Sequence, residues 1–213
     1  MAFHGSQQGM VAWPFHPVVR MEEGHWVLDL TRPPEEGWGP PYPWTVGRYN
    51  EPRPWMYDTP LFGGRRFHHI GLDLGGPAGT PVHAFADGWI HAVGIEEDAG
   101  GYGPTIVTRH DLDLPGGLDH PWSGSPRTIW VLHGHLSSND MAQWSAGDTV
   151  SMGQVLGHLG SPEENGGWSP HVHVQLALEP SDGIQMEGVV APENVDEALL
   201  RHPDPRLILG PLY

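Results

Sequence analysis

The sequence contains no cysteine, and its ten cationic residues are all arginine, so lysine is absent too. Without cysteine the chain can form neither disulfide bonds nor thiolate metal sites, so a bound transition metal must use histidine and carboxylate ligands. Without lysine there is no Schiff-base chemistry and no attachment point for biotin or lipoyl groups. These absences leave histidine, of which there are 15, as the main candidate for metal and acid–base chemistry.

Positive charge and long apolar segments are also scarce. The 10 cationic residues face 26 acidic ones, and the resulting net charge of -16 repels phosphate backbones and anionic membrane surfaces. No apolar run approaches the roughly 18 residues that a membrane-spanning helix needs, and residues 1–10 lack the basic and apolar parts of an export signal. We therefore expect a cytoplasmic protein without nucleic-acid or membrane partners; the sequence does not predict its oligomeric state.

A chain of 213 residues suits one domain with extensions. Short β-patterned runs separated by glycine-rich turns from residue 67 to 178 predict a mainly β fold, an antiparallel sheet curled into a hybrid or half-open β-barrel. Only residues 193–200 are typical of a helix, so helix content should be low. We expect a Trp/Pro/Gly-rich N-terminal extension over residues 1–60 that packs on a core of residues 61–180, and a C-terminal closing segment over residues 181–213.

His171 and His173 lie two residues apart in a β-patterned run. Alternate residues of a strand project to the same face about 7 Å apart, so one imidazole could bind a metal while the other addresses a bound water. Taken alone, such a pair more often faces solvent than forms a site. Other segments must supply the remaining ligands.

A second segment, His69-Ile70-Gly71-Leu72-Asp73, pairs a histidine with a carboxylate. In a straight strand these two side chains would stand about 13 Å apart, too far for a single ion with bonds of about 2 Å, so Gly71 must permit a bend. A third segment adds His133 and His135 at the end of a strand, where the two again share a face.

In this order and spacing, the three segments resemble peptidase family M23, the lysostaphin/LytM-like zinc metallopeptidases. That family has a His-x-x-x-Asp motif, then a Tyr-Gly/Ala-His-Leu-Ser segment, then His-x-His, and the likeness extends over residues 67–178. It implies that residues 61–180 form a zinc hydrolase core with one Zn²⁺ per chain. The ligands would be His69, Asp73 and His173, and the catalytic histidines that do not bind zinc would be His135 and His171.

The sequence departs from the family pattern at two positions. His133 stands where the family usually has tyrosine, and Gln175 stands where glutamate commonly follows the His-x-His pair. Both departures bear on the substrate rather than on the metal. We do not expect His68 or His133 to serve as a spare ligand.

The resemblance predicts zinc-dependent hydrolysis of a peptide or amide bond by a metal-activated water, with a peptidoglycan-type peptide or fragment as substrate. Residues 161–170 and 204–209 further resemble M23-like domains found beside small-molecule kinase and class III aminotransferase modules. Two enzymatic alternatives therefore stay open, a peptide substrate and a small non-peptide amide. From other classes, a non-catalytic metal-containing binding module remains an alternative, as does a histidine-rich protein that buffers several loosely bound ions.

Two neighbouring features concern access to this site. The segment from Pro52 to Pro60 lies just upstream of the metal motif and is expected to occlude the groove in part. Arg65 and Arg66 could bind a substrate carboxylate, although a solvated charge pair is the commoner arrangement.

Overall fold

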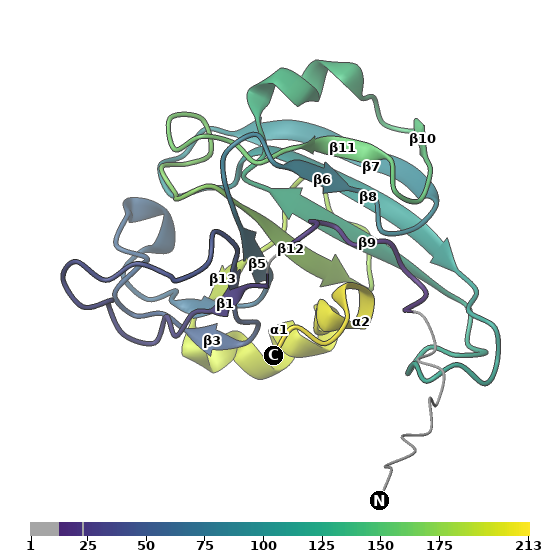
Figure 1. Cartoon of the computed structure of the whole chain (residues 1–213), viewed down its shortest axis with the longest axis horizontal. Coiled ribbons are helices and arrows are strands. Elements are labelled where there is room, and N and C mark those ends of the chain that lie inside the picture. The colour runs from purple at the N-terminus through teal and green to yellow at the C-terminus, as the bar shows by residue number, and fades with distance from the viewer. Residues whose placement is uncertain (1–12, 23) are drawn as a thin grey trace, which may run out of the picture.

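The computed structural model describes residues 13–22 and 24–213, so the first twelve residues of the predicted N-terminal extension lie outside it. One eight-stranded sheet forms its frame (Figure 1), and all neighbouring strands in it are antiparallel except the first pair, which is parallel. In spatial order the strands are β1 (Trp26–Val27), β2 (Thr45–Gly47), β5 (Leu72–Gly75), β12 (His171–Ala177), β9 (Arg127–Gly134), β8 (Gly103–Leu112), β7 (Gly88–Glu96) and β10 (Thr149–Val150).

Two small sheets and a few short helices complete the fold. One sheet pairs β11 (Val155–His158) with β6 (Pro81–His83), and the other has the order β13 (Val189–Val190), β4 (His68–His69) and β3 (Glu51–Pro52). The helices are α1 (Val195–Arg201) and α2 (Arg206–Leu209), with 3-10 turns at Pro60–Phe62, Ser138–Gln143 and Pro192–Asn194. The predicted mainly β fold with little helix is confirmed, and α1 lies where the sequence predicted its one helix. Among the described residues, no helix combines the length and apolar character required to traverse a bilayer.

The main sheet stays open, so the predicted barrel is not confirmed. Its outer strands are β1 and β10, and they do not pair with each other among the described residues. The two consecutive strands β6 and β7 belong to different sheets. Because β6 pairs with β11 instead of extending the main sheet, that pair forms a separate ribbon and the large sheet is not closed.

The alternation of side chains along the strands separates the core from the site. In β12 the even positions Val172, Val174 and Leu176 are fully buried in the main hydrophobic core. The odd positions, which include His171 and His173, therefore project from the opposite face of the strand. The same alternation in β5 sends Asp73 to the face opposite its apolar neighbours, so ligand candidates from both strands meet on one face.

The N-terminal extension contributes strands next to this face. β2 pairs with β5 so that Gly47 lies opposite Asp73, and β3 pairs with β4 so that Glu51 lies opposite His69. A side chain at position 47 would place its Cβ 2.7 Å from the Asp73 carboxylate, so the close approach requires glycine. The extension therefore packs against the strands of the site; its division from the core at residue 60 stays a prediction.

Candidate metal centre and its cleft

The three predicted metal ligands converge in space. His69 Nε2 lies 3.0 Å from His173 Nδ1, and both nitrogens lie 3.2 Å from Asp73 Oδ1. The chain bends between His69 and Asp73 as required, because β4 ends at His69 and β5, which belongs to another sheet, begins at Leu72. Gly71 lies in this bend, and a Cβ there would stand 2.2 Å from the His173 ring, so the ring can lie where it does only over a glycine.

In each ligand imidazole, a hydrogen bond places the proton on the ring nitrogen that points away from the metal centre. His69 Nδ1 lies 3.1 Å from the carbonyl oxygen of Arg48, which can only accept, so Nδ1 carries the proton and Nε2 keeps its lone pair. His173 Nε2 donates in the same way to Gln175 Oε1 at 3.0 Å, which leaves the lone pair on Nδ1. The Gln175 amide is itself oriented, because its nitrogen donates to the carbonyl oxygen of Glu187 at 3.3 Å. Gln175, one of the two departures from the family pattern, thus orients a ligand candidate.

Asp73 is held by a buried arginine that the sequence analysis missed. Arg53 Nη1 donates to Asp73 Oδ2 at 2.7 Å, and Arg53 Nε donates to Glu51 at 3.0 Å. Burial opposes ionisation of Asp73, but the adjacent His69 and the Arg53 guanidinium outweigh it, so the pKa of the carboxyl lies well below its usual value. The carboxylate is therefore charged, with Oδ1 directed toward the two imidazoles. The only sequence signal for Arg53 is its spacing of two from Glu51, which puts both on one face of an extended segment.

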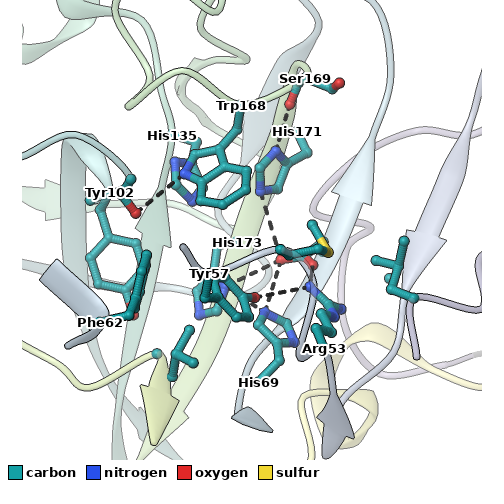
Figure 2. A pocket seen from close by; sticks show the side chains of 18 of the residues that line it. Arg53, Tyr57, Phe62, His69, Tyr102, His135, Trp168, Ser169, His171 and His173 are labelled. Carbon is teal, nitrogen blue, oxygen red and sulfur yellow. Dashed lines mark hydrogen bonds and ion pairs between the residues drawn. The ribbon is translucent and has the colours of Figure 1, made fainter. Parts of the chain in front are cut away.

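The two predicted catalytic histidines adjoin the ligands (Figure 2). The His135 and His171 rings are 4.4 Å apart between centroids, and His171 Nε2 lies 3.8 Å from Asp73 Oδ1. His171 Nδ1 donates to the carbonyl oxygen of Ser169 at 2.7 Å and His135 Nδ1 donates to that of Asn165 at 2.8 Å, so each Nε2 keeps its lone pair. Burial lowers the pKa of both imidazoles, most strongly for His135, which keeps them neutral near pH 7.

His135 also has an unusual backbone. Its φ is 63°, in the left-handed region that side chains other than glycine rarely adopt, and its N–H donates to the carbonyl oxygen of Tyr102 at 2.7 Å. Such strain persists only where the surroundings impose it, and it is concentrated at functional sites. His135 directly follows the last residue of β9, and its ring lies against that of His171.

These residues line one cleft of about 500 Å³. The tyrosine side chains of Tyr57 and Tyr102 stand in it beside the metal ligands (Figure 2), and Tyr102 packs 5.1 Å from the His173 ring between centroids. Burial raises the pKa of Tyr57 to about 12, so its hydroxyl stays protonated, and Arg53 donates to its oxygen at 3.3 Å. Arg66 also lines the cleft.

Other residues considered from the sequence lie elsewhere. Arg65 pairs with Glu193 on the exposed surface. His68 bonds to the Asn50 side chain, and His133 is fully buried in the sheet with neither ring nitrogen bonded to a partner in the described part of the chain. Neither of these two histidines joins the ligand cluster.

The donor set fits a tetrahedral zinc ion. Zinc bonds of about 2.0–2.1 Å separate neighbouring tetrahedral ligands by about 3.3–3.4 Å, close to the 3.0–3.2 Å observed between the three ligand atoms. At these distances the lone pairs of the two imidazole nitrogens and the carboxylate oxygen repel one another, unless a cation lies between them. Two neutral imidazoles and one carboxylate are also ligands that zinc accepts.

Comparison with known proteins found similarity over more than half of the chain. A sequence model described as peptidase family M23 matches residues 67–184, more than half of the chain, and that span includes all three ligand candidates and both further histidines. Among curated proteins, the DD-carboxypeptidase/endopeptidase Mpg of Neisseria meningitidis serogroup B is 35% identical over 110 residues, which cover 52% of this chain and 20% of that protein. The protein of the same name from Neisseria gonorrhoeae has the same identity and coverage. The chain thus matches about a fifth of the length of these curated relatives.

Two solved structures are similar over most of the chain. One is the catalytic domain of a variant of the prophage-encoded M23 protein EnpA from Enterococcus faecalis, with 25% identity and a TM-score of 0.42 over 73% of this chain and 92% of that chain. The other is the catalytic domain of lysostaphin from Staphylococcus simulans, with 22% identity and a TM-score of 0.41 over 70% of this chain and 88% of that chain.

Proposed function

Because the chain belongs to peptidase family M23, whose members are zinc metallopeptidases, we propose that it hydrolyses a peptide or amide bond with the help of one zinc ion. The observation that carries this proposal is the meeting of His69 Nε2, His173 Nδ1 and Asp73 Oδ1 within 3.0–3.2 Å of one another, with the lone pairs of both nitrogens turned inward. Three protein ligands leave the fourth position of a tetrahedral ion open, which distinguishes a hydrolytic zinc site from a structural one.

His69, Asp73 and His173 would hold the ion. Zinc in such a site lowers the pKa of a water molecule toward neutrality and polarises a carbonyl group. The hydrogen bonds to Arg48, Arg53 and Gln175 keep each ligand in its rotamer and tautomer, so the site is preorganised before the metal arrives.

His171 and His135 would transfer protons. Each is neutral and has Nδ1 bonded to a backbone carbonyl oxygen, so each can accept a proton only at Nε2 and can later return it from the same atom. Once protonated, either ring also becomes a hydrogen-bond donor toward an oxygen that gains negative charge. We assign them the transfer of a proton from the nucleophile to the leaving amine and the stabilisation of that oxygen.

For the substrate we propose a peptide, with peptidoglycan-type peptides as the first class to test. The support is the family and the name of the curated relatives, DD-carboxypeptidase/endopeptidase, which describes those proteins. A small non-peptide amide is the alternative substrate. This alternative rests on the proposed likeness of residues 161–170 and 204–209 to M23-like domains beside kinase and aminotransferase modules.

The test is zinc analysis of the purified protein beside two alanine variants. We expect near-stoichiometric zinc in the parent and its loss, together with hydrolysis, in His173→Ala. The matched control is His68→Ala, which removes a histidine adjacent to a ligand but outside the cluster and should keep both zinc and activity. Matched D- and L-amino-acid peptides and amides would then define the substrate. Full zinc retention in His173→Ala, or a zinc-loaded parent that cleaves none of them, would contradict the proposal.

A further inference from the structure

The cleft beside the metal centre has two walls of different origin. One comes from the family-matched region and carries the ligands, Tyr102 and Trp168. The other comes from residues upstream of residue 67 and combines two arginines, Arg53 and Arg66, with a group of apolar side chains from the N-terminal extension. We call this apolar group the extension wall; its side chains are Leu28, Leu30, Trp55 and Met56.

The extension wall is continuous with the catalytic histidines through aromatic contacts. Tyr57, next to Met56 in sequence, packs 5.8 Å from Trp168 between ring centroids, and Trp168 packs 6.4 Å from His135 (Figure 2). A ligand that touches the extension wall therefore also lies within the cleft that contains the ligands and the proton-transfer groups.

The extension wall is preformed and open. The Trp55 indole is oriented by a hydrogen bond from its Nε1 to the carbonyl oxygen of Leu30 at 2.8 Å, yet 37% of the residue is exposed. Its three partners are each partly exposed. Apolar surface held open in a concave site next to a polar centre is the usual composition of a ligand pocket, and covering it by a ligand is favourable.

The chemistry of the extension wall selects one kind of occupant. None of its four side chains is charged, and its one side-chain hydrogen-bond donor, Trp55 Nε1, already serves Leu30. A sugar or a charged residue would lose hydrogen bonds to water there without replacement. An apolar side chain makes no hydrogen bonds to water and would lose none.

We propose that the extension wall is a specificity subsite for a bulky apolar side chain, such as leucine or phenylalanine, in the residue beside the bond that is cut. This inference rests on the proposed peptide hydrolysis and adds the class of peptide.

The test uses two series of matched peptides in which the residue on the carbonyl side, or the one on the amine side, of the scissile bond is glycine, leucine or phenylalanine. In one series we expect kcat/KM to be at least about tenfold higher for the bulky residues, since differences of one to a few methylene groups are worth that much in an apolar pocket. Equal values in both series would overturn the proposal.

Variants then locate the effect. Trp55→Ala and Met56→Ala should each lower the ratio of kcat/KM for bulky residues to kcat/KM for glycine, and Met56→Ala breaks no side-chain hydrogen bond. The matched control is Trp38→Ala, because Trp38 is also in the extension and is 45% exposed but does not line the cleft. A preference unchanged in both cleft variants would overturn the proposal.

Calorimetric binding of the same peptides separates this inference from the proposed hydrolysis. Binding that favours leucine over glycine by about tenfold and weakens in Trp55→Ala supports the extension wall even if nothing is cleaved, and only the hydrolase assignment then fails. Equal affinities, no measurable binding of any peptide, or binding of an amino-sugar oligosaccharide instead would overturn the extension wall as an apolar subsite.

Discussion

Replacing Arg53 by methionine would leave the buried carboxylate of Asp73 without its guanidinium, and would leave the buried Glu51 with only the partly exposed Arg48, 3.6 Å away. The side chains of Arg53, Glu51 and Asp73 are only 2%, 4% and 12% exposed, so water cannot take over the role of the guanidinium. Removal of one partner from a buried ion pair typically costs about 3–5 kcal/mol. Since small domains are stable by only about 5–15 kcal/mol, we expect Arg53→Met to lose a large part of the free energy of unfolding.

The assay is denaturant unfolding of metal-free protein, repeated with zinc. Zinc should restore part of the lost stability in Arg53→Met, because a divalent cation beside Asp73 partly replaces the missing charge. Arg53→Lys should fall between the parent and Arg53→Met, since it keeps the charge but cannot bond both carboxylates with the same geometry.

The matched control is Arg109→Met. Arg109 lies 3.0 Å from Asp111, a separation comparable to that of the Arg53 contacts, but both side chains are nearly half exposed, at 46% and 43%. Exposed pairs contribute up to about 1 kcal/mol, so this variant should change little. The reasoning predicts that the buried Arg53 network contributes more to stability than the exposed Arg109 pair. An equal loss of unfolding free energy in Arg53→Met and Arg109→Met would refute it.

Three further predictions concern single substitutions. Gly71→Ala should bind zinc at least about tenfold more weakly in a competition assay, because its Cβ would stand 2.2 Å from the His173 ring; unchanged affinity would contradict the observed ring position. His135→Gln should keep its zinc but lower kcat by about 10²–10⁴, and an unchanged kcat would remove His135 from proton transfer. His133→Leu should raise stability at pH 7 by about 1–2 kcal/mol, because both buried ring nitrogens lack hydrogen-bond partners among the described residues. Burial also lowers the pKa of His133 from 6.5 to about 3, so the unfolded chain takes up a proton first and stability falls as pH drops through that range; urea unfolding at several pH values should show a shallower fall in the variant.

The resemblance to peptidase family M23 singles out the ligand candidates, and two features of their local geometry could be predicted from the sequence. A spacing of two places His171 and His173 on one face of any strand, and both rings indeed approach Asp73. The separation of His69 and Asp73 demanded a bend at Gly71, and the chain passes from one sheet to another there. Each of these inferences needs only the repeat of a strand and the length of a metal–ligand bond.

The features that the sequence analysis missed depend on contacts distant in the sequence. Arg53 lies in a proline-rich stretch without a recognisable motif; it directly follows β3, and the pairing of β3 with β4 brings it within reach of Asp73. The open sheet could not be predicted for the same reason, since local patterns indicate strands but do not say whether the outermost two will pair. The extension wall likewise becomes visible only once residues 28–56 are placed beside the cleft.

The two oxygens of Asp73 join the family-matched region to the N-terminal extension. Oδ1 faces the imidazoles of His69 and His173, and Oδ2 accepts from Arg53, which the extension supplies. Trp55 and Met56 of the extension wall lie two and three residues after Arg53 in sequence, so one short segment both orients a candidate metal ligand and borders the cleft. A displacement of this segment should therefore change zinc binding and peptide preference together, whereas Met56→Ala, which leaves Arg53 in place, should change the preference without changing zinc binding.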